Sequence, residues 1–341
     1  MKKLFAIVWL CLFFVSPVNA DDLKDLGFDE LSKLATEKND PKAQYELGLM
    51  YESGNGVDQN YTNAAKWYEK AALQGDAKAQ LNLGWLFEKG YGVERNTFEA
   101  KDWYEKAALQ GDARAQLNLG TLYALGDGVP LDNVKAKEWY EKSAMQGNER
   151  AQSYLGVMYY LGEGVPQNYA KAKEWFEKSA MQGHAKAQFN LAVMYDEGKG
   201  VDQDYAKALE WYEKAANQGD VDAQYNLGIK YEDGKGVEQN YAKALEWYEK
   251  AAEQDDVDAQ NNIALMYSEG KGVEVDLNKA KEWFERAANL NHPEAQYNLG
   301  IMYEDGNGVP QNIDEAKKWY QKACDNGLDN EICNSFSKDE N

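Results

Sequence analysis

Histidine, cysteine and proline are scarce in this sequence. Its 341 residues include only two histidines, three cysteines and six prolines. His184 and His292 are far apart and occupy equivalent positions of the internal repeat described below, immediately before a helix. We interpret both as surface helix caps, because a catalytic base or a metal site needs partners close by. The sequence therefore predicts no catalytic residue, no metal and no cofactor.

Basic residues are few relative to acidic ones, 37 against 58, which gives a formal net charge of −21. A protein that binds nucleic acid must neutralise phosphates with Lys and Arg, so this balance argues against nucleic acid as a partner. It favours a protein or peptide with a basic or mixed-charge segment. An acidic surface that only keeps an exported protein in solution explains the charge equally well.

Long hydrophobic runs are absent except near the start of the chain. Lys2 and Lys3 precede an apolar stretch from Leu4 to Val15, and Val18-Asn19-Ala20 fits a small-residue cleavage site. This pattern is typical of a bacterial secretory signal peptide, and the stretch is too short to span a membrane. We predict a cleaved signal peptide over residues 1–20, a periplasmic or secreted location, and no stable membrane anchor.

A unit of 36 residues repeats eight times without insertion or deletion between Pro41 and Leu328. We number its positions 1 to 36, starting at Pro41. An Ala-Gln pair recurs at positions 3 and 4, and a tryptophan recurs at position 27. Such a period indicates stacked units that bury their apolar faces against one another. We divide the chain into 1–20 signal peptide, 21–40 N-terminal cap helix, 41–328 repeats, and 329–341 C-terminal cap and polar tail.

Each unit reads as two antiparallel helices, which predicts an all-α fold. Asp or Asn recurs at position 36, where a short side chain caps the first helix (helix A), and a Gly-x-Gly-Val step ends that helix. Asp255 and Asn291 replace glycine at position 35 and are expected to adopt the same left-handed backbone conformation. We expect the tryptophans and their aromatic neighbours to form the core. Lys230, at position 10, is expected to lie along this core with its ammonium group in solvent.

The pattern AxAQxxLGxxYxxGxGVxxxxxKAxxWYxKAAxQG resembles the Sel-one-like repeat family, a relative of the tetratricopeptide repeat. The resemblance covers all eight units. It implies a right-handed α/α superhelical solenoid whose A helices line the concave wall. It also implies a non-catalytic, protein- or peptide-binding scaffold of the bacterial envelope, or a secreted host-interaction factor.

Two cysteines, Cys324 and Cys333, remain after the predicted cleavage. An exported protein meets oxidising conditions, and the spacing suits a disulfide that ties the C-terminal cap to the last repeat. Cysteine-rich secreted members of the family have similar helix-to-helix bridges. A metal or redox pair is less favoured because no third ligand lies near in the sequence.

An enzyme is the alternative class. Ser335 and Lys338 form the S-x-x-K spacing of β-lactamases and penicillin-binding enzymes, so a cell-wall or β-lactam-related activity is the competing hypothesis. The companion motifs of those enzymes are missing, and the string lies in the polar tail. The Glu-Asp-Gly-Lys-Gly loops lack the ligand spacing of calcium loops. The sequence therefore favours a protein that is not an enzyme.

The predicted groove lies where helix A does not pack, at positions 2, 5, 6, 9, 12 and 13 by resemblance to tetratricopeptide folds. Six units have asparagine at position 6, and its amide can pair with the backbone of an extended peptide. These residues are Asn82, Asn118, Asn190, Asn226, Asn262 and Asn298. Asparagine that is merely tolerated there is the alternative. Position 2 is basic in the first five units and acidic in the last three, which predicts a groove with polarity.

Repeats two to four depart from the pattern with aromatic, apolar and arginine residues, a composition typical of protein-binding hot spots. We predict a binding cluster there; extra packing between neighbouring units is the alternative. The cluster comprises Trp85, Arg114, Leu125, Arg150, Tyr154, Tyr160 and Leu161.

Overall fold

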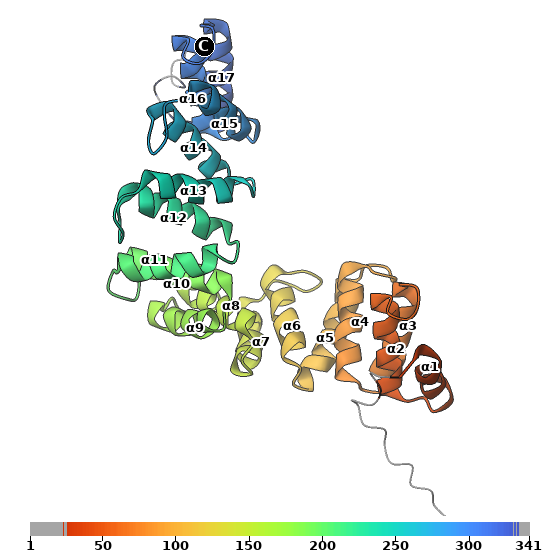
Figure 1. Cartoon of the computed structure of the whole chain (residues 1–341). Coiled ribbons are helices and arrows are strands. Elements are labelled where there is room, and N and C mark those ends of the chain that lie inside the picture. The colour runs from red at the N-terminus through yellow and green to blue at the C-terminus, as the bar shows by residue number, and fades with distance from the viewer. Residues whose placement is uncertain (1–22, 24–25, 330, 332, 334–341) are drawn as a thin grey trace, which may run out of the picture. The chain divides into compact units, whose positions relative to one another are not determined.

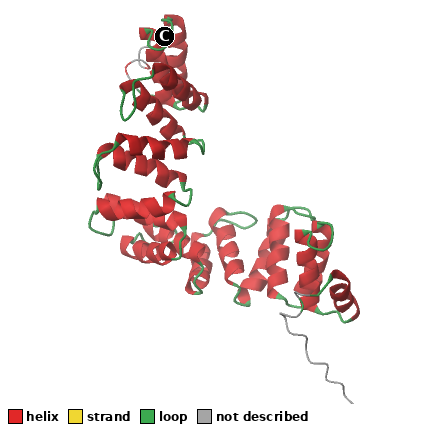
Figure 2. Ribbon diagram, viewed as in Figure 1, coloured by secondary structure: helices red, strands yellow, loops and turns green. Residues whose placement is uncertain are grey.

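The computed structural model describes residues 23, 26–329, 331 and 333. Every regular element in this part of the chain is a helix, as Figure 2 shows by its red ribbons and green loops. None of these helices is long and apolar enough to cross a membrane. The predicted signal peptide lies outside the described residues.

Seventeen helices, one cap and eight pairs, make up the described chain. The cap helix is α1 (Phe28–Glu37). The A helices are α2 (Pro41–Ser53), α4 (Ala77–Lys89), α6 (Ala113–Leu125), α8 (Glu149–Leu161), α10 (Ala185–Glu197), α12 (Val221–Asp233), α14 (Val257–Glu269) and α16 (Pro293–Asp305). The second helices of the pairs, the B helices, are α3 (Tyr61–Leu73), α5 (Thr97–Leu109), α7 (Asn133–Met145), α9 (Tyr169–Met181), α11 (Tyr205–Ala216), α13 (Tyr241–Ala252), α15 (Leu277–Asn289) and α17 (Ile313–Asp325).

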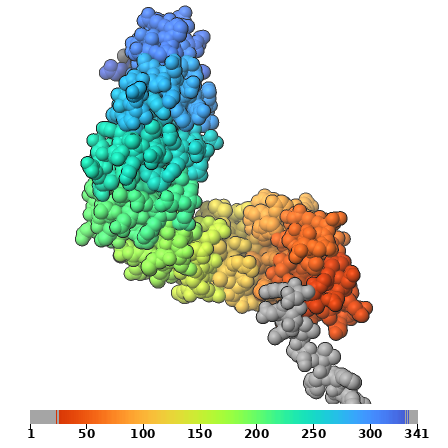
Figure 3. Space-filling model, viewed as in Figure 1, coloured from red at the N-terminus to blue at the C-terminus, as the bar shows by residue number. Residues whose placement is uncertain are grey.

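The chain forms two compact units, which we describe separately. Unit one extends to Gln146 and contains α1 to α7 (Figure 1). Unit two begins at Gly147 and contains α8 to α17. Within each repeat the A helix packs against its B helix. The space-filling view in Figure 3 shows a continuous outer surface over the consecutive repeats of each unit.

The helix ends follow the sequence signals. The side chain of Asp76 accepts a hydrogen bond from the backbone N–H of Ala79 (2.8 Å), and the other A helices have an equivalent cap. Helix α4 ends at Gly90 with φ of 74°, a left-handed conformation that glycine adopts without strain. Asp255 and Asn291 both have φ of 65°, so the expected replacement of glycine is confirmed.

The prediction that the tryptophans form the core is wrong in part. The fully buried aromatic ring is the residue at position 28, for example Tyr104, whereas seven of the eight tryptophans are only half-buried. A Lys or Arg three residues later covers each tryptophan ring; the Lys106 ammonium lies 3.7 Å from the centroid of Trp103. The position-28 ring packs on glycine in six repeats, and a Cβ at Gly156 would lie 2.4 Å from Phe176.

The recurring glutamine of the Ala-Gln pair connects consecutive repeats. The buried side chain of Gln80 donates to the carbonyl of Ala72 (3.0 Å) and accepts from the Gln110 amide (2.8 Å). Repeat seven lacks the second bond, because Leu290 stands where the other repeats have Gln or Asn. The Oε1 atom of Gln260 is consequently buried without a hydrogen-bond partner in the described structure.

The two ends of the repeat array have added contacts. Leu31 and Ala35 of α1 are buried against Ala43 and Leu47 of the first repeat, so α1 covers the face that has no preceding repeat. At the other end, Cys324 and Cys333 are at disulfide distance, with Cα atoms 5.3 Å apart. This pair links helix α17 to the segment that follows it.

Candidate functional site

Both histidines cap helices, as the sequence indicated. The Nδ1 atoms of His184 and His292 accept hydrogen bonds from the backbone N–H groups of Ala187 (3.2 Å) and Ala295 (3.1 Å). They are not surface residues, however: His184 is half-buried, and His292 is 8% exposed and contacts Asp258. Each ring is used in holding a helix end.

Four repeats satisfy the buried tyrosine hydroxyl at position 28 with the glutamate at position 12. The Tyr104 hydroxyl donates to the Glu88 carboxylate at position 12 of its own repeat (2.7 Å), and the amide of Asn118 in the next repeat also bonds it. Burial, with the Glu88 carboxylate beside it, raises the pKa of Tyr104 far above its usual range, so the hydroxyl keeps its proton. The same arrangement joins Tyr248 to Glu232 and Asn262.

Five of the six asparagines predicted to line the groove therefore have partners inside the protein. Asn82, Asn118 and Asn262 bond tyrosine hydroxyls. Asn226 donates to the carbonyl of Asp222 (2.7 Å), and Asn298 donates to Asn261 (3.4 Å). For the amide of Asn190, the described residues provide no hydrogen-bond partner, because position 28 of the preceding repeat is Phe176, which has no hydroxyl.

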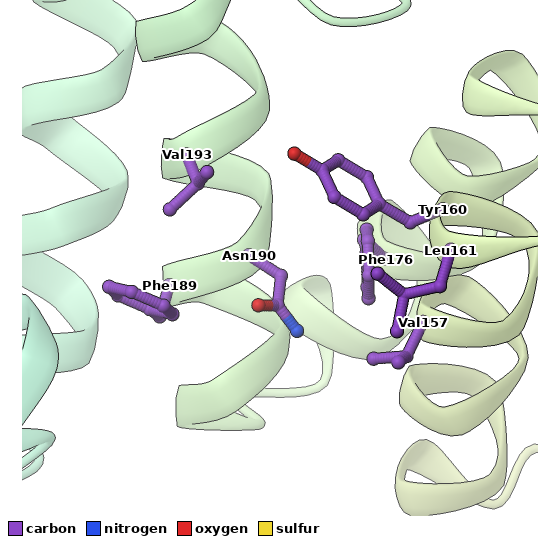
Figure 4. A pocket seen from close by; sticks show the side chains of 7 residues that line it. All are labelled: Val157, Tyr160, Leu161, Phe176, Phe189, Asn190 and Val193. Carbon is purple, nitrogen blue, oxygen red and sulfur yellow. The ribbon is translucent and has the colours of Figure 1, made fainter.

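Repeat four replaces the tyrosine arrangement with an apolar pocket of about 350 Å³. Phe176 stands in place of the usual tyrosine, Tyr160 in place of the acid at position 12, and Leu161 follows it. Figure 4 shows Tyr160 and Leu161 on α8 facing Asn190 on α10, with Phe176 of α9 between them. The full lining is Val157, Tyr160, Leu161, Phe176, Phe189, Asn190 and Val193.

Hydrogen bonds hold the ring of Tyr160 at the edge of this pocket. Its hydroxyl donates to the Glu197 carboxylate (2.8 Å) and accepts from the Lys199 ammonium (3.2 Å). The bond from Lys199 lowers the pKa of Glu197, and the bond to Glu197 raises the pKa of Lys199, so both groups stay charged near neutral pH. Tyr160 also packs edge-on against Tyr169, 5.2 Å between ring centroids.

The chemistry of the pocket is that of a binding site for an apolar group. Phe176 is 1% exposed and forms the floor, while Leu161 is 53% exposed at the rim. The free side-chain amide of Asn190 can donate hydrogen bonds from its NH2 group and accept them at its carbonyl oxygen. An apolar cavity with a few polar groups that fix orientation is the usual form of a ligand pocket, and 350 Å³ is at the small end of their range.

The predicted binding cluster divides between the two units. Trp85, Arg114 and Leu125 belong to unit one, where the Trp85 ring packs against Tyr91 and Leu125 is exposed. Arg150, Tyr154, Tyr160 and Leu161 belong to unit two. Only Tyr160 and Leu161 line the pocket.

Sequence reasoning missed Val157, Phe176, Phe189 and Val193. Phe176 had a visible signal, since it is one of two phenylalanines at a position that is tyrosine in the other six repeats. Beside the second, Phe284, the asparagine of the next repeat has a partner, since Asn298 donates to Asn261 (3.4 Å).

No group of three or more His, Cys, Asp or Glu side chains suited to a metal ion occurs among the residues that the structure covers. Ser335 and Lys338, on which the enzyme alternative rests, lie outside the described residues.

The geometry defines a helical-repeat solenoid with a pocket on its A helices. A family profile described as Sel1 repeat matches residues 41–76, 77–112, 113–148, 149–184, 185–220, 221–256, 257–292 and 293–328. The chain belongs to the Sel1 repeat family, whose members are generally non-catalytic scaffolds in protein–protein interaction.

Solved structures and a curated protein show the same relationship. The chain is 38% identical to c5321, a protective antigen of uropathogenic Escherichia coli strains with an SLR fold, over 88% of this chain and 72% of that one, with a TM-score of 0.68. It is 35% identical to a Sel1 repeat protein from Oxalobacter formigenes, over 92% and 90%, with a TM-score of 0.69. It is 62% identical over 32 residues to the chitin synthase regulator SKT5 of Saccharomyces cerevisiae, which is 9% of this chain and only 5% of that protein.

Proposed function

We propose that this chain is a non-catalytic scaffold of the bacterial envelope, or a secreted host-interaction factor, which binds a protein or peptide through the A helices of repeats four and five. The observation that carries the proposal is the pocket around Phe176. Three residues of repeat four depart from the repeat pattern, Tyr160, Leu161 and Phe176. Together they remove polar groups and leave an apolar cavity beside the free amide of Asn190.

The family and the charge support the rest of the proposal. Members of the family generally bind proteins, and the acidic balance favours a partner with a basic or mixed-charge segment. The basic, apolar and small-residue order of residues 1–20 supports export to the periplasm or beyond. That a relative is a protective antigen of a pathogen is in keeping with an exported location.

Site-specific photo-crosslinking tests this proposal. A benzophenone amino acid in place of Leu161, at the pocket rim, should capture a specific partner in cells. The same amino acid in place of Leu109 is the matched control, because Leu109 is also an exposed leucine at a helix end (73%) and does not line the pocket. Equal capture from both positions, or none from position 161, would contradict the proposal.

A further inference from the structure

Charge changes sign next to the pocket, within unit two. Position 2 of the A helix is Arg150 and Lys186 in the repeats that form the pocket, and it is Asp222, Asp258 and Glu294 in the three repeats that follow. All five side chains are exposed. Positions 2, 5, 9 and 13 lie on one face of an α-helix, so these charges share a face with Leu161, Phe189 and Val193 of the pocket.

The three carboxylates are only partly neutralised. Lys186 lies 2.6 Å from Asp222, but it also contacts Asp220 (3.1 Å). His292 is the only basic side chain within salt-bridge distance of Asp258 (3.0 Å) and Glu294 (3.7 Å) among the described residues. Its Nδ1 accepts the cap bond from Ala295, and its Nε2 lies beside Asp258. Among the described residues, Asp258 and Glu294 therefore have no Lys or Arg within salt-bridge distance.

The other ends of the same helices also have acids, two of which are paired with lysine. Asp233, Glu269 and Asp305 occupy position 13 in repeats six to eight, and all three are exposed. Lys235 and Lys271 balance the first two (2.7 and 2.8 Å). A cationic group that approached this face would meet acids at both helix ends, whereas the pocket itself is apolar with one free amide.

We propose that the occupant is an extended peptide segment with one bulky apolar side chain in the pocket and lysine or arginine side chains on the part that runs toward repeats six to eight. The amide of Asn190 bonds the peptide backbone beside the apolar residue, in the way that a neighbouring strand does. The cations pair with Asp222, Asp258 and Glu294. This inference rests on the proposed function and specifies the chemistry and polarity of its ligand.

Repeat six provides the pattern for a variant that removes the pocket. Repeat six has Glu232, Asp233 and Tyr248 at the three changed positions. The triple substitution Tyr160→Glu, Leu161→Asp and Phe176→Tyr therefore rebuilds in repeat four an arrangement that the fold already accommodates. The new hydroxyl at position 176 donates to the new glutamate and accepts from Asn190, which fills the pocket and removes the free amide.

The charge variant is Asp222→Asn, Asp258→Asn and Glu294→Gln. Its control is Glu238→Gln, Glu246→Gln and Glu274→Gln, which removes the same charge from exposed acids of loops and B helices in the same unit. Circular dichroism melting shows that each variant is folded before binding is measured.

The probes are fluorescein-labelled synthetic peptides that contain one Phe, Leu or Ala and three Lys, Ser or Glu on one side of it. Fluorescence anisotropy measures their binding to the full chain. We expect the Phe/Lys and Leu/Lys peptides to bind, with affinity at least tenfold lower after the apolar residue becomes Ala, as expected for loss of an anchor in a pocket. Replacing Lys by Glu in the peptide should lower the affinity by about the same factor. The pocket variant and the charge variant of the protein should also do so, whereas the control variant should bind like the natural chain.

The results separate the inference from the proposed function. Equal affinity for the Lys, Ser and Glu peptides would overturn the inference. A dimer of the chain that light scattering detects, and that the pocket variant converts to monomer, would also overturn it, because the occupant would then be a second copy of the chain. If no peptide binds but the photo-crosslink from position 161 still captures a partner, the inference fails and the proposed function stands. If that crosslink is also lost, both fail.

Discussion

A single phenolic hydroxyl distinguishes repeat four from six of its neighbours. Where position 28 is tyrosine, its buried hydroxyl must be paired, and the Glu at position 12 and the Asn of the next repeat commonly supply the partners. Phe176 needs no partner, so position 12 is free to become Tyr160, and Asn190 is left with its amide exposed to the pocket. The missing hydroxyl, together with Tyr160 and Leu161 in place of the usual acids, leaves this surface open.

The cap at His184 predicts a pH dependence of stability. Burial lowers the pKa of His184 below its usual range, because the charged ring loses hydration there. Only the neutral ring can accept the Ala187 N–H at Nδ1. The contribution is complete above the unfolded pKa of about 6.5 and is lost as pH falls from there through the lower folded pKa. We expect its loss to cost about 1 kcal/mol, the usual value of a helix cap.

Urea unfolding at pH 7.5 and at pH 5 measures this effect. His184→Asn is the matched variant, since Asn148 caps the preceding A helix without titrating. The variant should lose less stability than the natural chain over this interval; equal losses would show that His184 does not contribute. Glu149, Arg150 and Asp220 act on His184 electrostatically and are unchanged in both proteins.

Lys230 does not reach solvent as the sequence suggested. It is 5% exposed, and its ammonium lies 2.5 and 2.6 Å from the two carboxylate oxygens of Asp196 in the preceding repeat. The position-12 carboxylate of repeat five, Asp196, therefore pairs with Lys230 of the next repeat instead of the tyrosine at position 28. Burying two charges costs desolvation energy, and replacing both residues by uncharged ones removes this cost. Removing only one partner leaves the other charge buried without a counter-charge.

We predict that Asp196→Ala lowers the free energy of unfolding by about 3–5 kcal/mol, because Lys230 is left buried without a counter-charge. The double variant Asp196→Glu, Lys230→Met introduces residues that the first and last repeats have at these positions, and it should be at least as stable as the natural chain. Urea titration of the single and double variants checks both values. A double variant as unstable as Asp196→Ala would mean that the ion pair itself is needed.

At the scale of the element, the glutamine connection explains why the Ala-Gln pair recurs. In five repeats the glutamine at position 4 donates to a carbonyl of the preceding B helix and accepts from the side-chain amide at position 34 of its own repeat, so two elements are joined through one buried side chain. Repeat seven has Leu290 at position 34, and Gln260 Oε1 remains unpaired. An unsatisfied buried acceptor costs about 1–3 kcal/mol.

Leu290→Gln should therefore stabilise the protein by about 1 kcal/mol, since it supplies the missing donor on an already half-exposed side chain. The mirror variant, Gln254→Leu, removes the bond of Gln254 to Gln224 and should cost a similar amount. Hydrogen exchange of the amides of α13 to α15 detects both changes where they occur. No protection gained by Leu290→Gln would mean that Gln260 finds another partner.

Much of the fold followed from the period of the sequence, and the site followed only in part. The caps and left-handed turns were predictable because they depend on residues next to each helix end. The exchange of roles between Trp67, which is half-buried, and Tyr68, which is fully buried, was not, since two adjacent aromatic residues point in directions about 100° apart and periodicity alone does not rank them. Asn118 was taken as free because its partner, Tyr104, lies in the preceding repeat and is visible only once the repeats are stacked.

At the scale of the whole molecule, the net charge and the pocket should affect different rate constants, the first association and the second dissociation. The net charge of −21 attracts a cationic partner from a distance, and this attraction falls as salt screens it. The pocket acts only after contact, when an apolar side chain is removed from water. Exposed acids should therefore govern the association rate constant, and Tyr160, Leu161 and Phe176 should govern the dissociation rate constant.

Surface plasmon resonance with the captured partner, at 50 and 500 mM NaCl, separates the two contributions. We expect association to slow at least tenfold at the higher salt, while dissociation changes little. The variant Asp222→Asn, Asp258→Asn, Glu294→Gln should slow association at low salt and weaken its salt dependence. The pocket variant Tyr160→Glu, Leu161→Asp, Phe176→Tyr should instead speed dissociation at both salts. If the pocket variant changed only association, Phe176 would not be the floor of a binding site, and the partner would be held by charge alone.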